Sequence, residues 1–543
     1  MTAQAEAPPV RRGIRPVDAL FWVAVAAAVV ANVLVLVPAF TTVRLWEDEA
    51  FNLTVPLNLL RGLGYASDGT LSGSELAPFD VRISTGPVVL LPIAGVLALG
   101  IDPVVAGRLV ALIGWGALLA CLWVIGRRLG GRWTALAAAA LPLAYAADPL
   151  PSAIQTPVDI LGEVSAAALL AAALVVLHRR PWLAGLFIGL AVQAKFIALL
   201  AVPAFAVAAL LDAPGPGIWR RLRATWRRVL LAAACAAVPT LVVEAWKLAA
   251  LGPRGYVDNL RELAYFLLSG GQAGYRVPPL EKVGAFLSAW HLPWWLVAGI
   301  IVGGLVLGIL GIRAIVPAPS SLASSGGARV DVREFTVTAG AAAIGLVTYL
   351  AWWLVSSHTP VWLRHPAPGV LAFLPVVVAA VVVLARVALR SRDAADGDID
   401  ATRDDDDTSG DRDGDRTGGL AAENGRRSAV RRVVAVALGF AGLALLTASL
   451  VGRIATPAYG TWETLDQQRS AASDIRELGH ERLAAGVWDA PVSVIVLSGA
   501  HVGLVDAGAV VAGDPQVWLA VAPPDCELLL QTGSYLVCAA PGG

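Results

Sequence analysis

Long apolar runs recur along this chain and constrain its fold more than any other feature. A run of 18 or more apolar residues is long enough to cross the ~30 Å hydrocarbon core of a bilayer as a helix. Hydrophobic residues make up 57% of the 543 residues and charged residues only 15%, which excludes an ordinary soluble protein. We predict an all-α polytopic membrane protein with about 11 transmembrane helices, at 18–40, 104–126, 133–147, 160–177, 182–194, 196–211, 229–251, 293–313, 335–355, 366–390 and 433–451.

Arginine clusters beside these runs predict how the chain is oriented. Arg11, Arg12 and Arg15 precede the first run, and the positive-inside rule places them in the cytoplasm. The run at 88–100 is too short to span, and a span there would put the arginines at 127–132 outside. We therefore expect an interfacial or re-entrant helix on the outer face. The formal net charge of zero indicates no nucleic-acid partner.

Polar segments divide the chain into regions. Cys526 and Cys538 lie in a polar C-terminal region with a spacing that suits a disulfide outside the cytoplasm, whereas Cys121 and Cys235 are expected to be buried hydrophobes. Short strands are predicted in this region at Val492–Leu497, Val502–Val505, Val517–Val521 and Glu527–Leu530. The expected regions are a cytoplasmic tail (1–17), a transmembrane region (18–390) with outer loops 41–103 and 252–292, a disordered acidic cytoplasmic loop (391–429), a last transmembrane helix (430–451) and an extracytoplasmic α/β domain (452–543).

Three consecutive acidic residues, Glu47 to Glu49, follow the first predicted span. Carboxylates at the mouth of a membrane helix are costly near hydrocarbon and point to a functional site, although acidic residues also cap helix N-termini. The predicted topology gathers further charged residues on the same outer side. They are Asp80, Arg82, Asp148, Asp159, Lys195, Arg364 and His365. This set suits a site at the membrane–water interface, with a carboxylate as base and cations for a phosphate.

The order of these features resembles the GT-C glycosyltransferases. The Asp48–Glu49 pair after the first span, the outer loop and the arginine-flanked span at 126–132 carry the resemblance, as do Gly185–Lys195 and Arg364–His365. The nearest groups are the protein O-mannosyltransferase-like and lipid A aminoarabinose transferase-like families. The resemblance covers roughly 18–390 and implies a GT-C fold with interfacial helices beside the spans.

The resemblance also implies an activity: transfer of a sugar from a polyprenyl-phosphate donor to an extracytoplasmic acceptor, in a bacterial plasma membrane. An acceptor hydroxyl needs a base, for which Asp48 is the first candidate and Glu49 the second; Glu49 could instead orient Asp48 or cap the helix. The leaving phosphate needs cations. Candidates are Arg364, His365, Lys195 and Arg82.

Each of these candidates has a structural alternative. Lys195 could snorkel to the interface, Arg364 could anchor a span end, and Arg82 could pair with Asp80. Asp148 and Asp159 are expected to hydrogen-bond within their loop, with substrate contact as the alternative.

Three further expectations concern cofactors, the role of the C-terminal region and rival functions. No metal or other cofactor is assigned, and a Mg²⁺ or Mn²⁺ site on the outer carboxylates stays open. The C-terminal region is a candidate for acceptor recognition. The rival functions are a transporter or flippase of lipid-linked sugars and a scaffold without catalysis.

Overall fold

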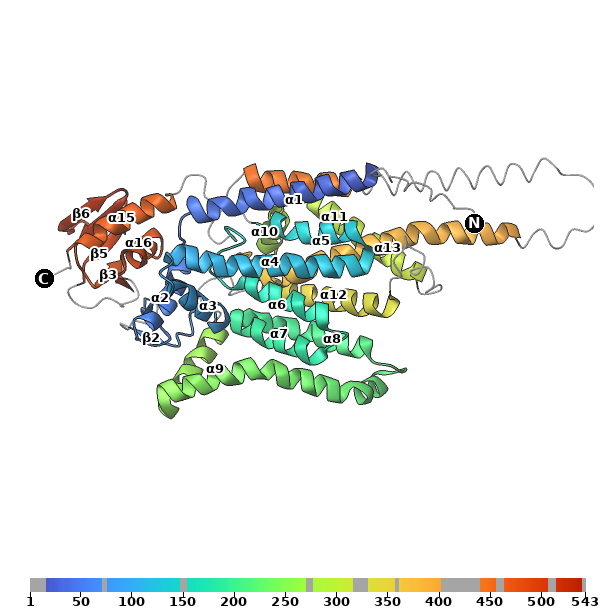
Figure 1. The fold of residues 1–543 in the computed structure, drawn as a ribbon, viewed down its shortest axis with the longest axis horizontal. Helices are drawn as coiled ribbons and strands as arrows, with labels where there is room; N and C mark the ends of the chain where they lie inside the picture. Colours follow the sequence, from blue (N-terminus) through green and yellow to red (C-terminus); the bar gives the residue numbers. More distant parts are fainter. Residues whose placement is uncertain are drawn as a thin grey trace, which may run out of the picture.

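The apolar runs form helices that lie side by side along the long axis of the molecule (Figure 1). The chain is seen in a computed structural model. It describes residues 16–70, 76–146, 154–269, 277–315, 331–356, 361–401, 440–455, 463–505 and 514–539.

Helices occur where the spans were predicted and also in the predicted outer loops and the C-terminal region. They are α1 (Pro16–Thr41), α2 (Glu47–Leu60), α3 (Pro87–Leu97), α4 (Pro103–Gly130), α5 (Arg132–Ala144), α6 (Glu163–Val176), α7 (Pro181–Ala194), the 3₁₀ helix η1 (Phe196–Ala201), α8 (Val202–Asp212), α9 (Ile218–Ser269), α10 (Pro279–Ser288), α11 (Trp294–Ile315), α12 (Val332–Val355), α13 (Ala367–Ala401), an apolar helix at Phe440–Ala455, α15 (Leu465–Glu477) and α16 (Ala490–Ser498).

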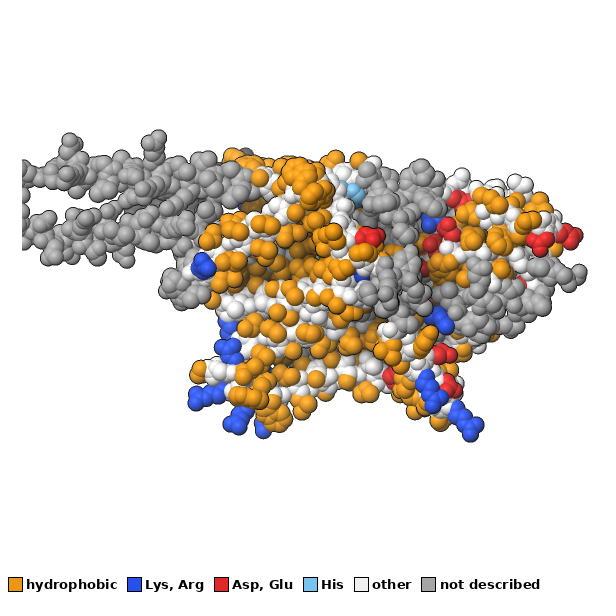
Figure 2. All heavy atoms as spheres, turned by 180° about the vertical axis from the view of Figure 1, so that it is seen from behind, with side chains coloured by type: hydrophobic (Ala, Val, Ile, Leu, Met, Phe, Trp, Pro, Cys, Tyr) orange, Lys and Arg blue, Asp and Glu red, His pale blue; other side chains and the backbone are white. Residues whose placement is uncertain are grey.

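Several of these helices are long and apolar enough to cross a membrane. Among the described residues, six helices qualify by length and composition, within α1, α4, α9, α11, α12 and α13. Hydrophobic side chains cover the surface of the bundle, and Lys and Arg gather near its ends (Figure 2). The predicted multi-pass membrane fold is confirmed.

Helix α13 continues to Ala401, into the segment expected to be disordered, and 402–439 lies outside the described residues.

The two ends of the bundle differ in what they carry. At one end, Arg132 pairs with Asp18 (2.5 Å), which joins the turn between α4 and α5 to the start of α1. Arg333 pairs with Asp212 (3.0 Å), which joins the start of α12 to the end of α8. At the opposite end lie α2, α3 and the C-terminal domain (Figure 1). Helix α3 packs against α2 and α4, and its 11 residues are too few to span a membrane.

The C-terminal domain is built on a five-stranded sheet in the order β4-β3-β5-β7-β6. Strand β3 is parallel to β4 and β5, and β7 is antiparallel to β5 and β6. The predicted disulfide between Cys526 and Cys538 is present, with a Cα–Cα distance of 5.2 Å. The strands of the chain are β1 (Ala66–Ser67), β2 (Ala77–Pro78), β3 (Arg482–Ala485), β4 (His501–Leu504), β5 (Gln516–Leu519), β6 (Leu528–Thr532) and β7 (Tyr535–Cys538).

One predicted strand of this domain is wrong. Residues Val492–Leu497 lie in helix α16, which crosses between the parallel strands β3 and β4. Asp489 caps the helix by accepting from the Ala490 N–H (2.8 Å), and Gly499 ends it with a φ of 90°. Nearly every residue of α16 is buried, so the apolar run lacked the period that distinguishes a helix from a strand.

Glycines on α7 allow a close approach of α9. A Cβ atom at Gly185 would lie 2.0 Å from the Ala232 carbonyl oxygen, and one at Gly189 would lie 2.2 Å from the Ala236 carbonyl oxygen. Small residues four apart let membrane helices pack backbone to backbone. This packing fixes the end of α7, where Lys195 follows.

Replacing Gly185 by Leu should force α7 and α9 apart, because the added side chain meets backbone atoms. Overpacking typically costs about 1–3 kcal/mol, so the melting temperature of the detergent-solubilised protein should fall. Gly299→Leu on α11 is the matched control, since a Cβ there has no neighbour within 4 Å. Equal melting temperatures for the two variants would contradict the close α7–α9 contact.

Candidate functional site at one end of the bundle

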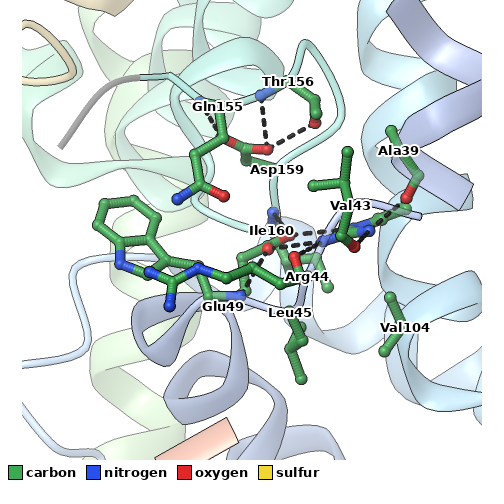
Figure 3. A network of polar contacts seen from close by, with 12 residues as sticks. Ala39, Val43, Arg44, Leu45, Glu49, Val104, Gln155, Thr156, Asp159 and Ile160 are labelled. Carbon is green, nitrogen blue, oxygen red and sulfur yellow. Dashed lines mark hydrogen bonds and ion pairs between the residues drawn. The ribbon is translucent and has the colours of Figure 1, made fainter. Parts of the chain in front are cut away.

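A buried arginine holds the segment that connects α1 to α2. Arg108, in the second turn of α4, donates to the carbonyl oxygens of Val43 (2.9 Å) and Arg44 (2.7 Å) and also to that of Ala39. These carbonyls lie in the last turn of α1 and just after it, where backbone acceptors lack intrahelical partners. Figure 3 shows them converging on one point. The position of the acidic stretch that begins α2 therefore depends on α4.

Glu49 is the ionic partner of this arginine. Its Oε1 accepts from Arg108 Nε (3.3 Å) and the Ile160 N–H (3.1 Å). Its Oε2 accepts from Arg108 Nη2 (2.9 Å) and the Trp46 N–H (3.2 Å). Both side chains are fully buried. With both oxygens engaged by donors, Glu49 caps α2 and braces the loop before α6, as the structural alternative predicted.

Asp48 points to a different partner. Its carboxylate forms an ion pair with Arg364, from the turn between α12 and α13. The guanidinium of Arg364 lies 4.9 Å from the ring centre of Trp46 and 4.4 Å from that of Trp362, distances typical of cation–π contacts. The side chains of Asp48 and Arg364 keep 19% and 12% exposure. The structure thus joins the first candidate base to a candidate phosphate ligand, with a route to solvent.

Lys195 lies at the same end, between α7 and η1. Its Nζ forms an ion pair with Glu163 (2.9 Å) and donates to the Leu161 carbonyl oxygen (2.7 Å). Arg364 and Asp48 lie close enough to act on its charge. Lys195 is held by specific partners in a buried position, unlike a side chain that merely snorkels to the interface.

Two titratable groups beside the Asp48–Arg364 pair have shifted pKa values. Burial, together with the Asp48 charge, raises the pKa of Glu47 to about 8, although Arg44 opposes the shift. Burial and the positive charges of Arg364 and Lys195 lower the pKa of His365 well below its usual range. At neutral pH Glu47 is mostly protonated, and His365 is neutral and offers hydrogen bonds instead of a positive charge.

The remaining predicted residues fall outside this cluster or beyond the described residues. Arg82 is exposed, and its backbone N–H donates to Asp80 (2.9 Å). Asp159 accepts from the N–H groups of Gln155 (2.7 Å) and Thr156 (2.9 Å), which is the local bonding expected of it (Figure 3). Burial, then the Glu49 charge, raises its pKa to about 7. Asp148 lies outside the described residues.

Metal ligands do not cluster in the part of the chain that the structure describes. No group of three or more His, Cys, Asp or Glu side chains there could hold a metal ion. Asp48 and two carboxylates at the same end of the bundle each form an ion pair with a cationic side chain: Asp48 with Arg364, Glu49 with Arg108 and Glu163 with Lys195.

Sequence reasoning missed several residues of this site. Arg108 is the one charged residue in the apolar stretch 103–126 of α4, and an intramembrane charge of that kind is itself a signal of a buried partner. Glu163 follows Gly162, whose φ of 83° starts α6, but nothing in the sequence pairs it with Lys195. The indoles beside Arg364 come from opposite ends of the transmembrane region, so no local pattern joins them.

The fold and the site together define a class: a helical membrane protein whose polar site lies at one end of the bundle, beside a small α/β domain. The comparison with solved structures supports this class. ArnT from Cupriavidus metallidurans, bound to undecaprenyl phosphate, matches with a TM-score of 0.52 and 12% identity, covering 96% of this chain and 98% of ArnT. The resemblance to GT-C proteins is confirmed for the fold.

Two further solved structures match with lower TM-scores. The apo state of the same ArnT gives a TM-score of 0.49 at 13% identity, covering 97% of this chain and 98% of that one. An oligosaccharyltransferase from Archaeoglobus fulgidus gives 0.42 at 13% identity, covering 89% of this chain and 64% of its own. No protein family profile and no curated protein matches the chain.

Arg108→Met should destabilise the protein strongly. Removing one member of a buried ion pair typically costs about 3–5 kcal/mol, and here several backbone carbonyls lose their donors too. Thermal melting in detergent measures the loss. Arg261→Met is the control, because the ion pair of Arg261 with Asp258 is exposed and such pairs contribute about 0–1 kcal/mol. Equal losses would contradict the bracing role.

Glu47→Gln should change how stability depends on pH. Native Glu47 keeps its proton up to about pH 8, whereas an unfolded glutamate loses it near 4.5. The native state binds more protons between these values, so this group costs stability as pH rises through that window. Relative to wild type, Glu47→Gln should become progressively more stable from about pH 4.5 to 8. A constant difference in melting temperature across the window would contradict the raised pKa.

Proposed function

We propose that this chain is a membrane glycosyltransferase that moves a sugar from a polyprenyl-phosphate donor to an acceptor hydroxyl outside the cytoplasm. The observation that carries the proposal is the Asp48–Arg364 ion pair, held beside Lys195 at one end of a GT-C fold. It supplies the two kinds of group that the reaction needs, a carboxylate that can accept a proton and cations that can bind a phosphate.

The proposed reaction is an inverting displacement. Asp48 takes the proton of the acceptor hydroxyl as its oxygen forms a bond to the anomeric carbon. The bond from that carbon to the phosphate oxygen breaks on the opposite face, and the polyprenyl phosphate leaves with the electron pair. Arg364 and Lys195 stabilise the charge that develops on the phosphate, and His365 offers a neutral hydrogen bond.

The contact between Asp48 and Arg364 suggests how donor binding prepares the base. A donor phosphate at Arg364 would compete with the Asp48 carboxylate for the guanidinium, because both are anions that arginine binds through paired N–H groups. Asp48 would then be free to accept the proton. The indoles of Trp46 and Trp362 would keep Arg364 in place throughout.

The sidedness of the proposal comes from the charges at the other end of the bundle. The arginine-rich turn between α4 and α5 lies with the start of α1, and the positive-inside rule favours the cytoplasm for this end. The Asp48 site and the C-terminal domain would then face outward, where a disulfide such as Cys526–Cys538 persists.

Asp48→Asn should abolish most sugar transfer while leaving the fold intact. Loss of a general base typically costs about 10²–10⁴-fold in rate. The purified protein would be incubated with a panel of labelled polyprenyl-phosphate sugars, and consumption of each donor would be scored. Asp466→Asn is the control, because that carboxylate is 80% exposed on α15. Near-normal transfer by Asp48→Asn would exclude Asp48 as the base, and carrier movement without turnover in wild type would favour a flippase.

A further inference from the structure

The C-terminal domain grips the peptide backbone just before Asp48. Gln468 of α15 is fully buried, and its amide makes two hydrogen bonds to a single residue. Its Oε1 accepts from the Leu45 N–H (2.7 Å), and its Nε2 donates to the Leu45 carbonyl oxygen (3.1 Å). This reciprocal pair recognises backbone alone, so it fixes where the chain runs, whatever the side chain at that position.

Other contacts of the same domain flank this grip. The Leu465 N–H donates to the Thr42 carbonyl oxygen (3.0 Å), and Asp489 pairs with Arg44 (3.1 Å). Trp488 packs edge-on against Phe51 of α2, with ring centres 5.5 Å apart. Helix α16 packs against α2 at this end of the molecule, and α15 packs against α16 (Figure 1). The domain is therefore seated on the segment that carries the proposed base.

The grip on Leu45 bears directly on the catalytic groups. Trp46, the next residue, donates its N–H to Glu49 (3.2 Å) and places its indole under Arg364. Asp48 follows within the first turn of α2. Arg108 holds the carbonyl of the preceding residue, Arg44, from the transmembrane side. A shift at Leu45 would move the indole, the base and its arginine together.

We infer that Gln468 is a positioning residue for Asp48, through which the C-terminal domain completes the catalytic site. The inference rests on the proposed function, since it concerns the geometry of that base. A primary amide both accepts and donates, which the two bonds to Leu45 require. A methionine of similar length does neither, and a glutamate does both only when it carries a proton.

The test compares three variants in the transfer assay. Gln468→Met should lower kcat by about 10–100-fold, since small misplacements of catalytic groups have effects of that size. Gln531→Met on β6 is the matched control, because Gln531 is exposed in the same domain and should keep wild-type kcat. A kcat of Gln468→Met equal to that of the control would overturn the inference.

Gln468→Glu gives a readout that a purely structural role would not move. Its kcat relative to wild type should rise as pH falls, because the protonated carboxyl restores the donor to the Leu45 carbonyl oxygen. A pH-independent ratio below one would overturn the positioning role. If Gln468→Met does not fold, the pH dependence of Gln468→Glu still tests the positioning role of Gln468.

Amide hydrogen exchange separates this inference from the proposed function. Exchange across residues 43–49 should be at least about tenfold faster in Gln468→Met than in Gln531→Met, because a buried backbone N–H loses its acceptor and opens more often. Unchanged exchange would refute the grip even if transfer occurs. Fast exchange in a protein whose wild type transfers no sugar would refute the proposed function and leave the grip standing.

Discussion

The buried ion pair between Arg108 and Glu49 is the interaction on which the site depends. It connects α4 to the start of α2 and, through Ile160, to the loop before α6, while the same guanidinium binds the carbonyls that end α1. Burying two charges is expensive, and the geometry repays this only when every donor and acceptor is used. Here both carboxylate oxygens are engaged twice. The result is a rigid support for the first turn of α2. Asp48 lies in that turn but takes no part in the Arg108–Glu49 network.

This division of labour between neighbouring carboxylates follows from their positions on α2. Glu49 faces the bundle and meets Arg108, Asp48 faces the cluster with Arg364, and Glu47 lies against Arg44 with its proton retained. Successive helical residues point about 100° apart, so three adjacent acids meet three environments. Only one of them keeps a charge that is free to exchange partners. A run of acidic residues thus provides two structural supports and, in the proposed function, one reactive group.

Much of the fold could be predicted from the sequence, because span length and hydropathy are local properties. The short helix α3 and the Cys526–Cys538 bond were likewise predictable from length and context. Helix α16 was not, since full burial erases the period that separates helix from strand. For the site, the order of charged residues along the chain predicted Asp48, Lys195 and Arg364 as members. It could not show that Glu49 would meet Arg108, or that Gln468 would meet Leu45, because those pairings depend on three-dimensional packing.

The distance along the chain between Leu45 and Gln468 has a consequence for biosynthesis. Their separation is 423 residues, so the ribosome must add that many residues after Leu45 before the segment carrying Asp48 gains these hydrogen-bond partners. The membrane helices insert as they emerge, but the arrangement around Asp48 waits for the α15–β7 domain to leave the ribosome and dock. Nascent chains and products of premature termination would reach the bilayer as bundles without a finished site.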